Sequence, residues 1–472
     1  MDATLRAYRR FSESVMAQES LKRRWVQLAI VLGVLIFSAS SAVALPGKYH
    51  IFVIGLPFAL VGLFVLLKWP PLGLVGLTIL GLFRAIHIPL IGLPAVMLSG
   101  LTVLWIFKML AYDKIFKLVI TPSVTAVLFF IIAVLISSAV GQFPWFPVSG
   151  APVETQIGGA LIFLASFFAF LLVAQQVRDI RWLKWMVFPF LAFAGLFAIL
   201  AVVPGGRRII HQIFSTKATG GSLFWVWSVS LSISQALFNR KLKMSWRILL
   251  GFVGIGILYV GIIPGRSWVS GWVPPIIALV TIVWVGMPNI ALPLSTLAAA
   301  IMASQYSTLY NLVAGENEYS AVSRLDAWRV MGEIIGVNPI LGVGPSNYYF
   351  YTPLFNILGF YVQFNSHNNY IDLLAQTGVV GFLCFFWFVW TIGKLGFRLL
   401  KRVPKGGFAH AYVVACIGGL VASVVAGMLG DWVLPFYYNI GIEGLRASAP
   451  AWMYWGGLVA IEQMLLMNKP VD

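Results

Sequence analysis

The chain has 472 residues, of which 60% are hydrophobic and only 10% are charged, and its mean hydropathy is +0.91. A soluble chain carries about 25% charged residues, so this composition excludes a soluble globular protein and predicts a polytopic membrane protein. The net charge of +17 could suggest nucleic-acid binding, but the positions of the basic residues indicate membrane topology instead. The two cysteines, Cys384 and Cys416, lie in apolar runs and predict no disulfide or metal framework.

The apolar runs predict an all-α integral membrane protein with about 14 (12–14) transmembrane helices, because a bilayer core about 30 Å thick takes roughly 20 apolar residues per helix. The third span is short, and Pro274-Pro275 interrupts the tenth. The spans are expected at residues 26–44, 50–68, 71–83, 90–108, 118–140, 157–177, 183–203, 219–238, 247–264, 268–286, 288–305, 370–393, 408–428 and 449–467.

These spans divide the chain into five parts. We expect a cytoplasmic basic segment at 1–25, transmembrane helices 1–11 within 26–304, an outer loop at 305–366, transmembrane helices 12–14 within 367–467 and a cytoplasmic tail at 468–472. With the N-terminus in the cytoplasm, 23 of the 32 Lys and Arg residues face inward and 9 face outward, as the positive-inside rule requires. The outward basic residues are those at 48, 84, 207, 208, 217, 266, 324, 329 and 446.

The outer loop is the longest connection, and connections of such length are usually functional. Ser323 and Asp326 form a capping-box pattern that predicts a helix over 323–336. Trp328, Met331 and Ile335 follow at helical spacing, so we expect an amphipathic helix on the outer membrane surface.

The two arginines of this helix differ in their neighbours. Arg329 has Asp326 three residues before it and Glu333 four residues after it, which predicts local pairing. Arg324 has no acid on its own face, so a solvated arginine and an anion ligand remain equally good interpretations.

Other outward cations also lack nearby acids, and together they suggest an anionic ligand at the outer surface, since guanidinium groups suit phosphate and diphosphate. Arg266, in "GIIPGRSWVSGW", lies at the outer end of one span, directly before the next; snorkelling to lipid headgroups is the alternative for it. The remaining candidates for substrate binding are Arg84, Arg207, Arg208 and His211, with Lys217 close by.

His367 lies in "SHNNYID", just before an apolar span that Asn369 and Asp372 are expected to cap. The positive end of the helix dipole should keep the imidazole neutral near pH 7, and a neutral imidazole can act as a general base. On the pattern alone, an interfacial histidine bonded to headgroups or loop carbonyls is the better interpretation. The sequence has no Asp-x-Asp, Cys/His cluster, Walker or Rossmann pattern, so we expect no metal and no cofactor.

At these residues the chain resembles the O-antigen ligase and polymerase family. The family pattern R-x-x-x-W, then P-x-x-G-x-G, then H-N before an apolar helix with a glycine pair appears here in order. Arg266 stands in place of the arginine of an upstream Ser-Arg-Gly segment, although Gly265 replaces the serine. The matching pieces are Arg324–Trp328, Pro339–Gly344, His367-Asn368 and "AQTGVVGFL".

The resemblance implies a metal-independent, inverting glycosyltransferase of the GT-C kind in the bacterial inner (plasma) membrane, with its active site facing the periplasm. Such an enzyme moves a glycan from undecaprenyl diphosphate to an acceptor hydroxyl, for surface polysaccharide or lipopolysaccharide biosynthesis. By position, His367 would be the general base, and Arg266 and Arg324 would hold the diphosphate. The implied partners are this lipid-linked donor, a lipid A–core or glycan acceptor and the lipid bilayer, without nucleic acid.

Three alternatives stay open. The acceptor could be a protein serine, as in a protein O-oligosaccharyltransferase. A polyprenyl-linked glycan transporter or flippase without chemistry is disfavoured, because transporters place charges at the bilayer midplane and only Glu462 lies more than three residues inside a span here. A structural scaffold explains the outward arginines least well.

Overall fold

The computed structural model describes residues 25, 32–33, 36, 60–84, 92–112, 114–304 and 318–472. Residues 1–70 and 71–472 form two compact units, and the second contains every helix labelled below. Within the described ranges the regular elements are helices, with two isolated β-bridges, Phe83–Phe214 and Ile357–Phe360. The expected all-α class is confirmed for this part of the chain.

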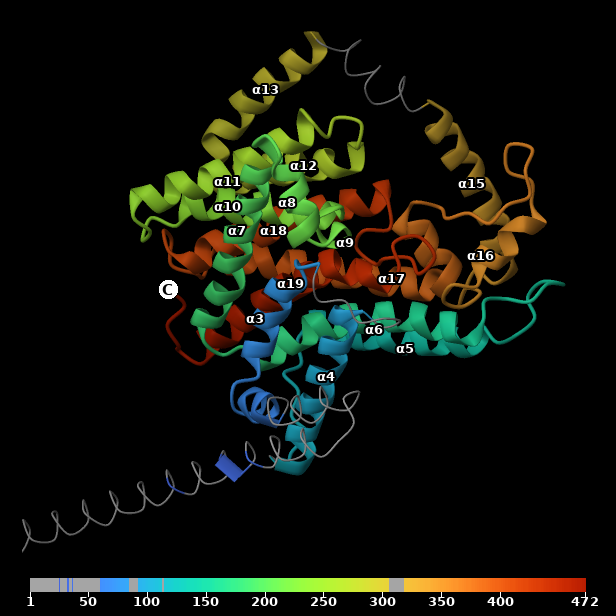
Figure 1. Ribbon diagram of the computed structural model, residues 1–472, viewed down its shortest axis with the longest axis horizontal. Coiled ribbons are helices and arrows are strands. Elements are labelled where there is room, and N and C mark those ends of the chain that lie inside the picture. Colours follow the sequence, from blue (N-terminus) through green and yellow to red (C-terminus); the bar gives the residue numbers. More distant parts are fainter. Residues whose placement is uncertain are drawn as a thin grey trace, which may run out of the picture. The chain divides into compact units, whose positions relative to one another are not determined.

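The second unit runs through the following helices (Figure 1). They are α3 (Pro71–Leu80), α4 (Leu93–Phe107), η2 (Lys108–Tyr112), α5 (Pro122–Val140), α6 (Val153–Gln176), α7 (Ile180–Val202), α8 (Gly206–Ile213), α9 (Thr216–Thr219), α10 (Ser222–Phe238), α11 (Met244–Ile262), α12 (Val269–Gly286), α13 (Pro288–Ser304), α15 (Glu318–Val337), α16 (Tyr348–Tyr351), η4 (Thr352–Leu354), α17 (Asn369–Leu400), α18 (Phe408–Leu429), η5 (Ile442–Gly444) and α19 (Leu445–Leu466).

Every span expected from residue 71 onward coincides with a helix, but the count of fourteen is not confirmed. In the described residues eight helices are long and apolar enough to cross a membrane, or up to nine if the bent pair Leu60–Lys68 and Pro71–Leu80 is one span. α10 is apolar but shorter, at 17 residues. The expected spans at 26–44 and 50–68 lie mostly outside the described residues.

The centre of the second unit is built around α19. This helix is buried over most of its length, and its large side chains, such as Trp452, Tyr454 and Trp455, are fully covered. A helix that is apolar on all sides belongs in the interior of a bundle. α19 packs chiefly on α6, while α18 packs on α10 and α12, and α17 runs along α5 and α18.

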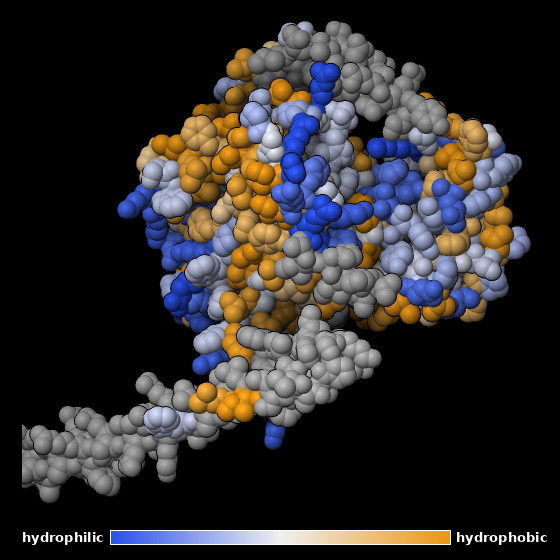
Figure 2. All heavy atoms as spheres, in the orientation of Figure 1, coloured by the Kyte–Doolittle hydropathy of each residue, from blue (hydrophilic) through white to orange (hydrophobic). Residues whose placement is uncertain are grey.

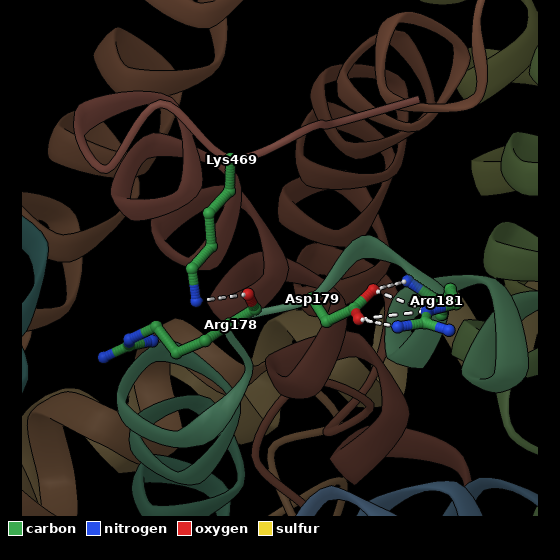
Figure 3. Close-up of polar contacts among 4 residues, drawn as sticks. All are labelled: Arg178, Asp179, Arg181 and Lys469. Atoms are coloured by element: carbon green, nitrogen blue, oxygen red, sulfur yellow. Dashed lines mark hydrogen bonds and ion pairs between the residues drawn. The ribbon is translucent and has the colours of Figure 1, made fainter. Parts of the chain in front are cut away.

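Polar contacts tie the expected inward connections to one another. Lys469 donates to the carbonyl oxygen of Arg178 at 3.3 Å, and Arg181 pairs with Asp179 at 2.8 Å beside it (Figure 3). On the expected outer side, Arg84 donates to the carbonyl oxygen of His211 at 2.7 Å. These contacts join inner residues with inner and outer with outer, which supports the predicted grouping; its orientation toward the cytoplasm stays a prediction.

α17 is broken one quarter of the way along, at Gly378. This glycine has φ 63° and ψ −168°, so the backbone leaves the helical conformation there. The carbonyl oxygens released by the break accept hydrogen bonds from the outer loop: Val343 N donates to Ala375 O at 2.8 Å and Gly344 N to Gln376 O at 3.1 Å. A broken transmembrane helix is stable only where protein satisfies its backbone in this way.

The other side of the break is satisfied by the same loop. Val379 N donates to Pro339 O at 2.8 Å, and Val380 N donates to Ile340 O at 3.2 Å. Gly342 has φ 72°, and a Cβ atom there would lie 2.6 Å from the backbone of α17. The P-x-x-G-x-G segment is therefore the structural partner of the broken helix.

α15 confirms the expected helix of the outer loop but begins earlier, at Glu318. Ser323 consequently lies inside the helix, and the capping-box prediction is wrong. Its buried face, with Val330, Met331 and Ile334, packs against α16 and α17. Trp328 and Ile335 are partly buried on that face. The apolar face thus rests on protein, and contact of the helix with a membrane surface stays a prediction.

Candidate functional site

A cavity of about 360 Å³ lies where α15, α16 and the start of α17 meet the connection that precedes α19. It brings together two residues singled out from the sequence, Arg324 and His367. The other lining residues are Ser323, Ala327, Tyr349, Ile357, Gln363, Phe364, Asn365, Tyr438 and Asn439.

His367 reaches this cavity because the backbone bends sharply before α17. Its φ is 50°, a left-handed conformation that costs a non-glycine residue about 1–3 kcal/mol and is often found at functional sites. The His367 N–H donates to the side-chain oxygen of Asn365 at 2.6 Å. Asn368 then caps α17, accepting from the N–H groups of Tyr370 and Ile371.

The expected caps, Asn369 and Asp372, have other roles. Asn369 accepts from Val433 N at 2.8 Å and donates to Leu434 O at 2.7 Å, so it holds the α18–α19 connection against α17. Buried Asp372 accepts from the Tyr348 hydroxyl at 2.6 Å and from Ser366 Oγ at 2.7 Å. The predicted capping pair is therefore wrong, and both side chains brace segments that surround His367.

Trp328 fixes α15 against the His367 loop. Its indole N–H donates to the carbonyl oxygen of Ser366 at 2.9 Å. Arg324 lies one helical turn before Trp328, so this bond places the guanidinium on the same side as the imidazole.

Arg324 and Arg329 differ in the way the sequence predicted. Arg329 pairs with Asp326 at 2.9 Å and also donates to the carbonyl oxygen of Asn356 at 2.9 Å. Glu333 is exposed, and the structure records no ion pair between it and Arg329. Among the residues that the structure describes, Arg324 has neither a hydrogen bond nor an ion pair, although burial lowers the pKa of its guanidinium.

The imidazole of His367 is biased toward its neutral form. Burial lowers its pKa below the ordinary value; Asp431 opposes this shift and Arg324 adds to it. From the sequence we expected the helix dipole to keep the imidazole neutral, whereas in the structure its burial away from water is the main cause. A neutral imidazole and an uncompensated guanidinium thus share one cavity.

The connection 430–444, between α18 and α19, lies behind His367 and was not predicted from the sequence to belong to the site. The side-chain amide of Asn439 lies 3.5 Å from His367 Nδ1 and donates to Asp431 at 2.7 Å. Asp431 also accepts from Phe436 N at 2.8 Å, and burial raises the pKa of its carboxyl. The available signal was an Asp and an Asn in the short connection 430–444, between two strongly apolar helices.

Arg266 does not line this cavity. It is exposed in the turn between α11 and α12, and its carbonyl oxygen accepts from Trp272 Nε1 at 3.0 Å. The turn adjoins the connection 430–444 through the rings of Trp268 and Trp432, whose centroids are 5.9 Å apart.

The remaining basic candidates form a separate group around α8. Arg207, Arg208 and His211 are exposed on this helix, and Arg84 is tied to it through the carbonyl oxygen of His211. Figure 2 shows hydrophilic side chains gathered over the part of the surface where α8 lies in Figure 1. None of the four residues lines the His367 cavity.

Fold and cavity together define a multi-pass, all-helical membrane protein with a polar cavity beside a broken helix. Residues 242–386 match the family model described as O-antigen ligase. The match supports membership of the O-antigen ligase family, confirms the resemblance drawn from the motifs and indicates a membrane enzyme of glycan transfer. It includes Arg266, Arg324 and His367 and ends within α17. No curated protein matches the chain.

Proposed function

We propose that the protein is a metal-independent, inverting glycosyltransferase that moves a glycan from undecaprenyl diphosphate to an acceptor hydroxyl on the outer face of the bacterial inner membrane. The observation that carries this proposal is the shared cavity of Arg324 and His367. An unpaired guanidinium is suited to a diphosphate, and a neutral imidazole is suited to accept a proton.

The reaction is a single displacement. The acceptor oxygen forms a bond to the anomeric carbon while His367 takes the hydroxyl proton. The bond from that carbon to the diphosphate oxygen breaks, and undecaprenyl diphosphate leaves with the electron pair. Attack opposite the leaving group inverts the anomeric centre. Arg324 stabilises the charge that develops on the diphosphate, and the partly buried setting strengthens this interaction.

The site is held by segments that are far apart in sequence. Trp328 fixes α15, Asn369 fixes the α18–α19 connection, and Asn439 supports the imidazole from behind. Such support matters because a base must be placed within hydrogen-bond reach of the proton it removes.

Arg266 and the basic residues around α8 lie outside the cavity, and we propose supporting roles for them in binding the donor. Arg266 is exposed beside Trp268 and would contact the donor from the α11–α12 turn. Arg84, Arg207, Arg208 and His211 would attract anionic lipid or donor to the outer surface. Ligase, polymerase and protein O-glycosylation differ only in the acceptor, so one assay serves all three.

The test uses the purified full chain in detergent, a bacterial undecaprenyl-diphosphate glycan and a mixed acceptor extract. The expected result is acceptor-dependent release of undecaprenyl diphosphate and a product whose anomeric configuration, determined by NMR, is inverted. Movement of the intact donor across liposomes without release would instead identify a flippase.

A further inference from the structure

We infer that a second cavity, formed by the α5–α6 connection, binds uncharged sugar residues of the glycan. This inference rests on the proposed function and names a substrate subsite for it. The cavity has a volume of about 450 Å³ and is lined by residues 141–144 and 146–150 together with Gln156 and Tyr351. None of its lining residues is charged, which disfavours a phosphate group as its occupant.

The connection is held in a defined shape by one buried side chain. Asn347 donates to the carbonyl oxygen of Gly141 at 2.9 Å, and it accepts from Ala151 N at 2.9 Å. Both ends of the connection are therefore fixed to the segment that leads into α16. A site formed in advance loses less conformational freedom when a flexible oligosaccharide binds.

The lining combines aromatic rings with neutral polar groups. Phe146 packs on Tyr351 with ring centroids 4.6 Å apart, and Phe143 is exposed at the rim. Aromatic rings suit the apolar faces of sugars, and a few placed amides and hydroxyls suit their hydroxyl groups.

Several of those polar groups are available for a ligand. The Gln142 amide nitrogen is used, because it donates to Gln156 at 2.7 Å and to the carbonyl oxygen of Ser138 at 3.1 Å. Within the described part of the chain, no hydrogen bond engages the Gln142 side-chain oxygen, the Ser149 hydroxyl or the Tyr351 hydroxyl. The Gln142 oxygen can accept a hydrogen bond from a sugar hydroxyl, and the two protein hydroxyls can either donate to one or accept from one.

The two cavities lie on either side of α16. Tyr351 lines this second cavity, whereas Tyr349 of the same short helix lines the His367 cavity. The ring of Tyr349 stacks on the ring of Tyr438, with centroids 4.5 Å apart. In Figure 1 the α5–α6 connection lies near α16, as the bonds of Asn347 require. A glycan whose reacting sugar is at His367 can therefore continue past α16, with later sugars in the second cavity.

The binding test uses saturation-transfer NMR with the purified full chain. The probe is a neutral oligosaccharide released by mild acid from the surface polysaccharide of the source strain. Tyr351→Phe removes one hydroxyl and Phe146→Leu removes one ring, and each should raise the Kd about three- to tenfold. Tyr361→Phe is the matched control, since Tyr361 is exposed and does not line the cavity, and its Kd should equal that of the wild type.

A turnover test separates this inference from the function on which it rests. With a donor carrying a single sugar, both variants should match the wild type, whereas with a long glycan their kcat/KM should fall about three- to tenfold. Unchanged Kd and kcat/KM in both variants would refute the subsite and leave the enzyme intact. Oligosaccharide binding without any turnover would refute the proposed function and leave the subsite.

Discussion

Replacing Gly378 by alanine should damage the protein far more than its single added carbon suggests. The residue has φ 63°, and an added Cβ would collide with the backbone of Ile340, which cannot move aside as a flexible side chain can. Gly336 of α15 is a matched control, because it is helical and an added Cβ meets nothing within 4 Å.

The magnitude follows from the contacts at the break. The backbone of Gly378, with φ 63° and ψ −168°, lies in a region almost confined to glycine, and it costs another residue about 1–3 kcal/mol. Displacement of the 339–344 segment also weakens the four backbone hydrogen bonds that join it to α17, each worth about 0.5–1.5 kcal/mol. Gly378→Ala should therefore lose about 3–9 kcal/mol of unfolding free energy if all four bonds break. Gly336→Ala should be neutral or gain up to about 1 kcal/mol.

The assay is thermal unfolding of both variants in the same detergent, followed by turnover of any folded Gly378→Ala protein. We expect a clearly lower unfolding midpoint for Gly378→Ala and reduced turnover, because the break positions the start of α17 and hence His367. Equal midpoints for the two variants would show that the loop and the broken helix do not support each other.

The remaining predictions concern charge, pH and topology. Arg324→Ala should lower kcat/KM about ten- to a hundredfold. Arg329→Ala should lower it only mildly, because Asp326 and Asn356 hold that side chain away from the substrate. Equal losses in the two variants would contradict the assignment of Arg324 as the diphosphate ligand. The turnover rate should fall as the pH drops through the pKa of His367, which burial lowers below the ordinary value for histidine because it favours the neutral base. A rate that rises on acidification would exclude a neutral imidazole as the base. Lys217→Cys should react with an impermeant thiol reagent from outside and Lys243→Cys should not, both positions being exposed; the reverse pattern would invert the topology.

The elements of the fold were predictable where a local pattern decides them. Hydropathy located helices from residue 71 onward, because a long apolar run is helical in a bilayer. Hydropathy could not decide how many of these helices cross the membrane. α10 is apolar but has only 17 residues, and α19 lies in the bundle without being one of the eight candidate spans. The caps at Ser323 and Asn369 were misplaced by a few residues because several Ser, Asn and Asp residues compete for such positions.

Two of the four polar residues of the candidate site, Arg324 and His367, were predictable from the sequence, and Asp431 and Asn439 were not. Arg324 and His367 were found because their neighbours leave them unpaired and because the family motif includes them. Asp431 and Asn439 were missed because more than sixty residues separate them from His367, and only the packing of α18 against α17 brings them close. The link between Gly378 and the 339–344 segment was hidden because hydrogen bonds between distant backbone groups carry no local signal.

The most direct test of the central claim is the release assay with His367→Ala. Donor binding should persist, because Arg324 is unchanged, while release of undecaprenyl diphosphate should fall about 10²–10⁴-fold, the usual contribution of a positioned base. His410→Ala is the control: this histidine lies in α18 against Phe238 and does not line the cavity, so turnover should stay near that of the wild type. Added EDTA should change neither rate. Undiminished release by His367→Ala would contradict the account, and His367 would then be only an interfacial histidine.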